Sequence, residues 1–358
     1  MEKERIVYAD LLRILATFAV IMLHVAAGLF NEQPGSFDWE VCNVYNSLVR
    51  WTVPVFVMLS GMFFLNPERD VSVPKLYKKN ILRLLIALVV WGVFYQLTAD
   101  RDSAKFASMP FLGRLPSWLQ NVSFSFAKLV FGPAWYHLWF LYMLIGLYIL
   151  TPIYRIFVKN AAYSDFVYLL ILFAVFGMVV PQISKVTEHI NPMLKVNFRM
   201  SELINYSGYF IAGYFFSKYD IPRIATRLIY VGGILSFFFT VVATHLLSVR
   251  LGYGNPLFYD NLMPTTMLET FALFLAFKQL RYRKFSDFQY KIISQLSVAT
   301  FGIYLIHIFI LSEFSDFGFT SNVINPIIAI PLKTIVVFVV SFAIIFLLRK
   351  IPYVRNIC

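Results

Sequence analysis

Long apolar segments alternate with short polar and basic segments along the whole chain. A helix needs about 20 mostly apolar residues to cross a bilayer, and lipid offers the backbone no hydrogen-bond partner, so such segments are expected to be helical. The pattern predicts an all-α integral membrane protein of about ten transmembrane helices, forming a single domain over residues 1–358. The predicted spans are 8–30, 44–65, 80–98, 135–154, 165–183, 202–217, 228–248, 260–277, 297–314 and 327–348.

Composition excludes a soluble globular protein. Hydrophobic residues make up 59% of the chain and charged residues 14%, whereas a soluble domain carries about 25% charged residues. The net charge of +12 is compatible with nucleic-acid binding, but the basic residues lie between apolar segments, so the expected partner is the lipid bilayer and not nucleic acid. Cys42 and Cys358 have no metal-ligand spacing and no disulfide pattern, so no metal site is expected.

The distribution of basic residues predicts the orientation. With the N-terminus in the cytoplasm, most of the 31 Lys and Arg residues fall in cytoplasmic segments, as the positive-inside rule requires. Arg50 is counted with the outer segments. An even number of spans then places both termini in the cytoplasm. The longest segment between spans, 99–134, lies outside and is expected to cap or line an outer cavity.

The first predicted span carries a polar stripe. Asp10, Arg13, Thr17, His24 and Gly28 interrupt an otherwise apolar helix, and at helical spacing they fall within an arc of about 60°. Arg13 and His24 are then about 16 Å apart along one face. Asp10 is three residues before Arg13, within pairing distance.

The stripe favours acyl transfer onto a hydroxyl. His24 can take the hydroxyl proton as a general base, and Arg13, paired with Asp10, can neutralise donor phosphates or a developing oxyanion. The alternatives are structural. Asp10 and Arg13 can simply mark the cytoplasmic interface, with the Arg13 side chain reaching toward water. His24 can be a structural histidine that hydrogen-bonds a neighbouring helix.

Other spans also contain polar residues. Glu269 lies within 260–277, where a carboxylate needs a partner or a neutral, protonated state. Tyr304 and His307 lie in a second stripe, and His307 either positions the acceptor and shares a proton with His24 or serves only in packing. Ser60 can act as a nucleophile, although a Ser-Gly pair more often lets helices pack closely. The second stripe, within about 80° of arc, consists of Ser297, Thr300, Tyr304 and His307.

Several sequence blocks resemble the acyltransferase 3 family of bacterial membrane acyltransferases. Within that family the chain looks most like the enterobacterial common antigen O-acetyltransferase type, a membrane domain without an extracytoplasmic catalytic domain. Relatives often carry two arginines at the start of the third span, where this chain has Lys79 and Arg83. The blocks are Asp10 with Arg13-x10-His24, Val53–Gly61, Lys78–Arg83, Tyr136–Leu141 with Tyr148 and Pro152, and Ser297–His307.

The resemblance implies a substrate pair and a location. The donor is acyl-CoA, typically acetyl-CoA, with no permanently bound cofactor, and the acceptor is a glycan or lipid-linked sugar. Lys79 and Arg83 are expected to bind the donor, unless their charges only reflect membrane orientation. Tyr304, His307 and Glu269 are expected to bind substrate. The expected location is the bacterial cytoplasmic membrane. A transporter or flippase for lipid-linked glycan, or a scaffold for a polysaccharide synthase, are the alternatives.

Overall fold

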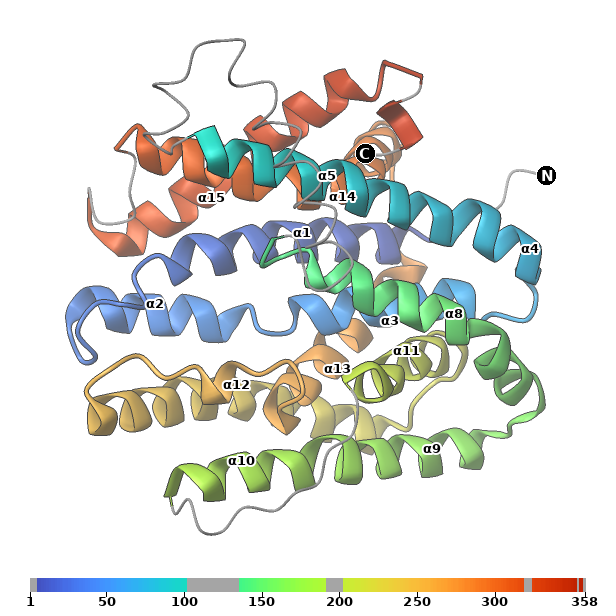
Figure 1. Ribbon diagram of the computed structural model, residues 1–358. Coiled ribbons are helices and arrows are strands. Elements are labelled where there is room, and N and C mark those ends of the chain that lie inside the picture. The colour runs from blue at the N-terminus through green and yellow to red at the C-terminus, as the bar shows by residue number, and fades with distance from the viewer. Residues whose placement is uncertain (1–4, 102–134, 191–201, 319–323, 353, 357–358) are drawn as a thin grey trace. The chain divides into compact units, whose positions relative to one another are not determined.

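The computed structural model describes residues 5–101, 135–190, 202–318, 324–352 and 354–356, and every regular element in these ranges is helical (Figure 1). The all-α prediction is therefore confirmed for the described part of the chain. Most of the predicted outer segment 99–134 lies outside the described residues. The α-helices are α1 (Val7–Ala27), α2 (Phe37–Leu48), α3 (Thr52–Phe64), α4 (Val73–Lys75), α5 (Leu82–Arg101), α8 (Trp139–Asn160), α9 (Tyr163–Leu172), α10 (Val180–Ile190), α11 (Glu202–Lys218), α12 (Arg223–Leu251), α13 (Pro264–Gln279), α14 (Asp287–Asp316) and α15 (Pro326–Leu348).

Within the described residues, seven segments are long and apolar enough to cross a membrane. They match the predicted spans one, two, four, five, seven, nine and ten. The other three predicted spans, 80–98, 202–217 and 260–277, also form helices, namely α5, α11 and α13. Of these, α11 has 17 residues and α13 has 16, which is shorter than the roughly 20 residues that a straight crossing needs. The protein is thus a multi-pass membrane protein, and the count of ten stays a prediction.

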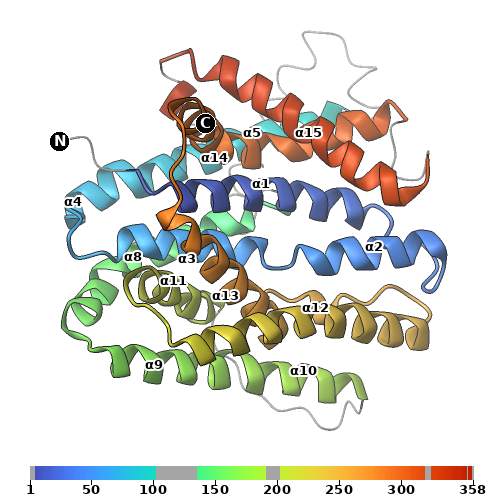
Figure 2. The ribbon, with the colours of Figure 1, turned by 180° about the vertical axis from the view of Figure 1, so that it is seen from behind.

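The chain forms two compact units, and the boundaries between them fall after Arg69, inside α8 and inside α15. The first unit comprises Met1–Arg69 and Tyr154–Phe346, and the second comprises Asp70–Ile153 and Leu347–Cys358. In the first unit, α1 packs against α14, α3 and α2, while α11 packs against α3. Helices α12 and α13 pack together, and α13 also contacts α1 and α3 (Figure 2). The first unit therefore surrounds α1, the helix with the polar stripe, with four other helices.

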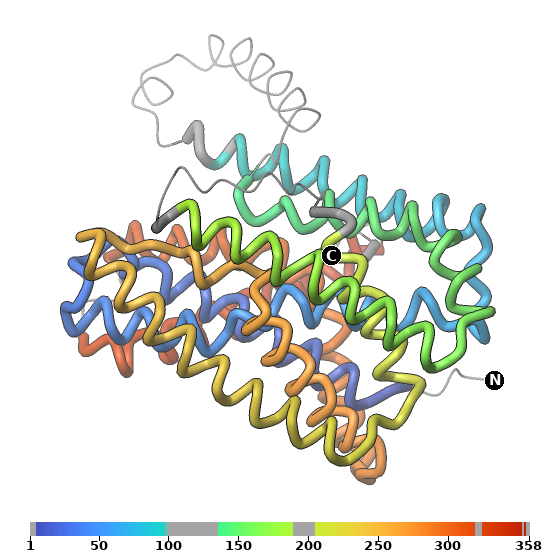
Figure 3. Tube along the Cα trace, turned by 90° about the horizontal axis from the view of Figure 1, so that it is seen from below, coloured from blue at the N-terminus to red at the C-terminus, as the bar shows by residue number. Residues whose placement is uncertain are grey.

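Two helices of the first unit are joined by a π-helical turn. The turn η2 (Phe173–Val179) links α9 to α10, and the three elements follow one another as one long rod (Figure 3). They correspond to the predicted span 165–183. A π-helical turn often marks a functional position or a local insertion in a helix. A second π-helical turn, η1 (Leu76–Ile81), lies in the second unit and leads into α5.

Local sequence explains where α14 and α13 begin. The Ser286 hydroxyl accepts from the Gln289 backbone N–H at 3.3 Å, and the Gln289 side chain accepts from the Ser286 N–H at 3.0 Å. This reciprocal capping box satisfies two N–H groups that otherwise have no partner in the first turn of α14. Helix α13 begins with Pro264, because the first helical position does not need the N–H that proline lacks.

The second candidate span, Phe37–Phe64, is broken in the middle. Helix α2 ends at Leu48 and α3 begins at Thr52. Pro54 explains the break, because proline cannot donate to the carbonyl four residues earlier and its ring clashes there. That carbonyl belongs to Arg50. Proline is tolerated in the first turn of a helix, so α3 restarts just before Pro54 and the interruption falls at residues 49–51.

Two glycines let α3 and α11 approach closely. A Cβ atom at Gly61 would lie 1.7 Å from the Phe210 carbonyl oxygen, and one at Gly213 would lie 1.8 Å from the Met58 carbonyl oxygen. Only hydrogen fits at either position. Small residues at such contacts are the usual way for membrane helices to pack tightly. The close packing predicted at the Ser60-Gly61 pair occurs here.

A charged clamp closes the loop between α11 and α12. Lys278, at the end of α13, donates to the Tyr219 carbonyl at 2.7 Å and to Asp220 at 3.0 Å. Arg281 donates to the same carboxylate at 3.1 Å. The hydrogen bonds from Arg281 and Lys278 lower the pKa of Asp220 from 3.8 to about 2. The clamp therefore ties the 219–222 turn to the end of α13.

Aromatic packing organises the second unit. His137 is 3% exposed and packs edge-on against Tyr95, with ring centroids 4.9 Å apart. Tyr95 also stacks on Trp135 at 5.3 Å. His137 thus lies inside an aromatic cluster that joins α5 to the segment before α8.

Candidate active site

A buried aspartate lies at the start of α1. Asp10 is 5% exposed and forms ion pairs with Arg5 and with Arg13, the latter at 3.3 Å. The Ser297 hydroxyl of α14 donates to Asp10 at 2.5 Å, and Arg13 donates to the Ser297 oxygen at 3.3 Å. The prediction that Asp10 and Arg13 are within pairing distance is confirmed. We call these four residues the Asp10 cluster.

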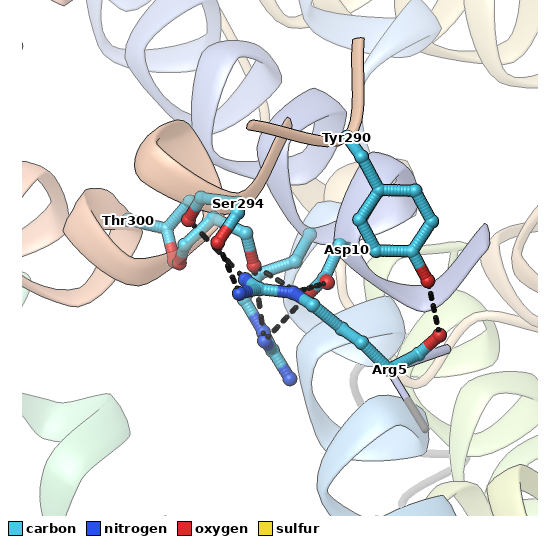
Figure 4. Close-up of polar contacts among 7 residues, drawn as sticks. Arg5, Asp10, Tyr290, Ser294 and Thr300 are labelled. Carbon is cyan, nitrogen blue, oxygen red and sulfur yellow. Dashed lines mark hydrogen bonds and ion pairs between the residues drawn. The ribbon is translucent and has the colours of Figure 1, made fainter. Parts of the chain in front are cut away.

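Further contacts tie the Asp10 cluster to α14 (Figure 4). Arg5 donates through Nη2 to the Ser294 carbonyl at 3.2 Å, and its own carbonyl accepts from the Tyr290 hydroxyl at 3.1 Å. Thr300 donates to the Ser297 carbonyl at 2.7 Å. With two guanidinium groups and one carboxylate, the Asp10 cluster carries a net positive charge.

A third arginine approaches the Asp10 cluster. The guanidinium of Arg13 lies 5.5 Å from the centre of the Phe63 ring, and that of Arg69 lies 4.5 Å from the same ring. Both distances are within the range of cation–π attraction. Two positive groups thus converge on one aromatic ring at the end of α3, an arrangement suited to an anionic ligand.

The second site lies near the other end of α1, where two histidines face each other. The ring centroids of His24 and His307 are 5.3 Å apart. His307 is fully buried, and its Nδ1 hydrogen-bonds the Tyr304 carbonyl at 2.7 Å. A carbonyl can only accept, so Nδ1 carries the proton and Nε2 carries the lone pair of the neutral ring. The two imidazole rings are therefore neighbours at the contact between α1 and α14.

His24 lies closer to a helix end than the predicted span implies. The span was expected to extend to residue 30, but α1 ends at Ala27 and His24 is in its last turn. The helix ends early because Gly28 and the residues after it form turns. His24 remains within the first unit through its contact with α14.

Arg50 lies at the break between α2 and α3 and belongs to this second site. Helices α1 and α13, which carry His24 and Glu269, both pack against α3, and α1 also packs against α2. Arg50 donates through Nε to the Asn46 carbonyl at 3.0 Å and through Nη2 to the Asn46 side chain. Its guanidinium lies 4.2 Å from the centre of the Tyr259 ring. These contacts hold the guanidinium in one orientation.

Glu269 of α13 is the acidic group of the second site. It is 9% exposed, and neither carboxylate oxygen accepts a hydrogen bond from the described residues. A buried polar group without hydrogen bonds is costly, so this carboxyl group needs a partner beyond the described residues or a neutral, protonated state. We call His24, His307, Arg50 and Glu269 the histidine site.

The polar stripe of α14 divides between the two sites. Ser297 and Thr300 join the Asp10 cluster, whereas Tyr304 and His307 lie with His24. The stripe of α1 divides in the same way, with Arg13 in one site and His24 in the other. The two predicted stripes therefore face each other along the contact between α1 and α14.

The predicted donor-binding residues Lys79 and Arg83 lie in the second unit. Lys79 is in the π-helical turn η1 and Arg83 is in the first turn of α5, and both side chains are exposed. The neighbouring Lys75 forms an ion pair with Asp70 at 2.8 Å. Their part in donor binding stays a prediction.

Sequence reasoning missed Arg50 and Arg5. The signal for Arg50 was present, because it falls inside the predicted span 44–65, and a charged residue within a span usually has a function. It was instead counted with the outer segments. Arg5 was counted only as a cytoplasmic charge, although it shares Asp10 with Arg13.

The fold and the two sites define an all-helical, multi-pass membrane protein with ionisable groups between its helices. A model of the acyltransferase 3 family, described as an acyltransferase domain, matches residues 6–348. The chain belongs to this family, and it is an acyltransferase. Neither a curated protein nor a solved structure matches it at a significant level.

Proposed function

We propose that this protein is an O-acyltransferase of the bacterial cytoplasmic membrane. It moves an acyl group, most simply acetyl, from acyl-CoA to a hydroxyl of a cell-envelope glycan or lipid-linked sugar. Membership of the acyltransferase family supports acyl transfer. The observation that carries the proposal is the contact of His24 on α1 with the buried His307 on α14.

His24 acts as the general base. It takes the proton of the acceptor hydroxyl while the hydroxyl oxygen bonds to the thioester carbon and the carbonyl electron pair moves to oxygen. When the carbonyl re-forms, the carbon–sulfur bond breaks. The leaving thiolate takes the proton from the His24 imidazolium, which gives free CoA thiol and the acylated sugar and restores neutral His24.

The Asp10 cluster serves the donor. The sequence left two roles open for Arg13, and its pairing with Asp10 about 16 Å from His24 along α1 favours binding of donor phosphates. Arg69 adds a second positive charge at the same ring. Lys79 and Arg83 of the second unit remain proposed donor-binding residues on the basis of the sequence resemblance. The extended pantetheine arm then reaches along α1 toward His24.

The acceptor binds at the histidine site. Glu269 accepts from sugar hydroxyls, which offer the hydrogen bonds that the described chain does not supply. Tyr304 and His307 position the reacting hydroxyl beside His24. Of the glycan acceptors, an enterobacterial common antigen type of polysaccharide fits the sequence resemblance.

Purified protein in lipid nanodiscs tests this function with radiolabelled acetyl-CoA. Envelope glycan extracted from cells that lack the protein supplies the acceptor. We expect label to move to glycan and free thiol to form in equal amounts, and His24→Ala to abolish both. His245→Gln is the matched control, because His245 pairs with Glu40 outside the histidine site. Glycan movement across the membrane without thiol release would instead identify a flippase.

A further inference from the structure

Arg50 occupies an unusual position for an arginine. The segment Phe37–Phe64 is apolar enough to cross a membrane, and Arg50 lies in the middle of it, at the break between α2 and α3. Non-helical backbone at membrane depth is tolerated only where it is buried in protein or lines a water-filled cavity. The break therefore lies against other parts of the protein or lines a cavity, and it places a charged side chain at membrane depth.

The helices that pack around the break carry ionisable residues of the histidine site. His24 lies on α1, which packs against both α2 and α3, and Glu269 lies on α13, which packs against α1 and α3. Arg13, the arginine that the sequence pattern singles out, bonds to Asp10 and Ser297. Arg50 lies at the junction of α2 and α3, the two helices that pack against α1.

The hydrogen bonds of Arg50 fix its side chain through Nε and Nη2 and do not use Nη1. Nε and Nη2 donate to the backbone and the side chain of Asn46, and Tyr259 covers one face of the guanidinium. Nη1 donates to no other described residue. A fixed cation with an unused donor is a preorganised partner for developing negative charge.

We propose that Arg50 is a catalytic residue of the acyl-transfer step, whose Nη1 donates to the thioester carbonyl oxygen and stabilises the oxyanion. The inference rests on the proposed acyltransferase function. As the acceptor oxygen bonds to the carbonyl carbon, its proton goes to His24 and the carbonyl pair goes to the oxygen that faces Arg50. On collapse this pair re-forms the carbonyl, and the thiolate leaves with the proton from His24. Arg50 stays protonated throughout.

The competing interpretation is that Arg50 only caps the end of α2. The Asn46 carbonyl also accepts from the Val49 N–H at 3.3 Å, so Arg50 strengthens a helix end. Arg155 provides a matched control for such a role. It donates to the Phe64 carbonyl at 2.9 Å and the Asn66 carbonyl at 2.8 Å at the end of α3. It also donates to the Arg69 carbonyl at 2.9 Å, so the comparison uses kcat at saturating acetyl-CoA.

The test compares Arg50→Gln, Arg50→Lys and Arg155→Gln in nanodiscs with acetyl-CoA and envelope glycan. Removing an oxyanion donor typically lowers kcat by about 10² to 10³. We expect that loss for Arg50→Gln with unchanged binding of acetyl-CoA, and a smaller loss for Arg50→Lys, which keeps the charge. Arg155→Gln should lower thermal stability and leave kcat per folded protein near wild type. A fourth variant, Arg50→Ala, leaves space for a guanidinium ion from solution. Added guanidinium should restore part of the kcat of Arg50→Ala without raising its unfolding temperature.

The outcomes separate the two proposals. If wild type transfers acetyl and Arg50→Gln keeps near-normal kcat, the role of Arg50 is overturned while the function stands. The role of Arg50 is also overturned if the lower unfolding temperature of Arg50→Gln accounts for all of its lost activity and added guanidinium does not restore the activity of Arg50→Ala. If Arg50→Gln does not fold, Arg50→Lys decides through kcat. If wild type itself releases no thiol from acetyl-CoA, both proposals fail.

Discussion

The imidazole rings of His24 on α1 and His307 on α14 lie with their centroids 5.3 Å apart. The same two helices are joined at their other end by the hydrogen bond from Ser297 to Asp10, at 2.5 Å. The contact between α1 and α14 therefore joins a cationic site to an imidazole site. This arrangement suits a donor with a charged end and a reactive end.

Replacing His307 by phenylalanine tests whether its nitrogens matter. Phenylalanine keeps an aromatic ring in the fully buried position but removes both ring nitrogens. We expect kcat to fall by about tenfold, less than for loss of the general base itself, with the pH dependence of kcat altered. The measurement is the pH–rate profile of acetyl transfer. Full turnover in His307→Phe would show that His307 serves only in packing.

Orientation can be tested with two single cysteines. Lys284 lies in the loop before α14 and is exposed, and Tyr253 lies after α12 and is 56% exposed. The positive-inside rule predicts that Lys284 is cytoplasmic and Tyr253 is outside. An impermeant thiol reagent applied to intact spheroplasts should label Tyr253→Cys and spare Lys284→Cys. The background is Cys358→Ser, since Cys42 is fully buried. The reverse labelling pattern would contradict the orientation.

The sequence predicted most helices because apolar length is a local property. It also predicted the stripe of α1, since Asp10, Arg13 and His24 stand out in an apolar helix. What it did not predict depends on contacts between helices. The partition of the stripe into two sites follows from the partners that α14 supplies. Arg50 was missed because it was counted with the outer segments, although it lies within the predicted span 44–65.

The glycine contact between α3 and α11 should tolerate no side chain. In Gly61→Ala the new methyl group would meet the Phe210 backbone at 1.7 Å, and backbone cannot move aside as a flexible side chain can. We expect a large fall in unfolding temperature or a failure to fold, since overpacking commonly costs about 1–3 kcal/mol or more. Gly232→Ala is the control, because its Cβ would meet only the end of Leu268 at 3.3 Å. Equal stability of the two variants would contradict the packing.

The ion pairs of Asp220 with Lys278 and Arg281 predict that stability depends on pH only in the acid range. The pKa of Asp220 falls from 3.8 to about 2 through its bonds to Arg281 and Lys278, so the folded state favours the ionised carboxylate. Its contribution is complete above about pH 4 and is lost as pH falls toward 2. The unfolding temperatures of wild type and Asp220→Asn should differ slightly at pH 6, since the carboxylate is mostly exposed, and should converge as pH falls below about 2. A difference that grows in acid would contradict the clamp.

The most direct test of the account is the rate of thiol release from acetyl-CoA by His24→Gln. Glutamine keeps much of the size and hydrogen bonding of histidine but cannot take a proton near neutral pH. A general base contributes about 10² to 10⁴ in rate, so His24→Gln should be nearly as inactive as His24→Ala, with the unfolding temperature of both close to wild type. Near-normal turnover in His24→Gln would contradict the role of His24 as the base.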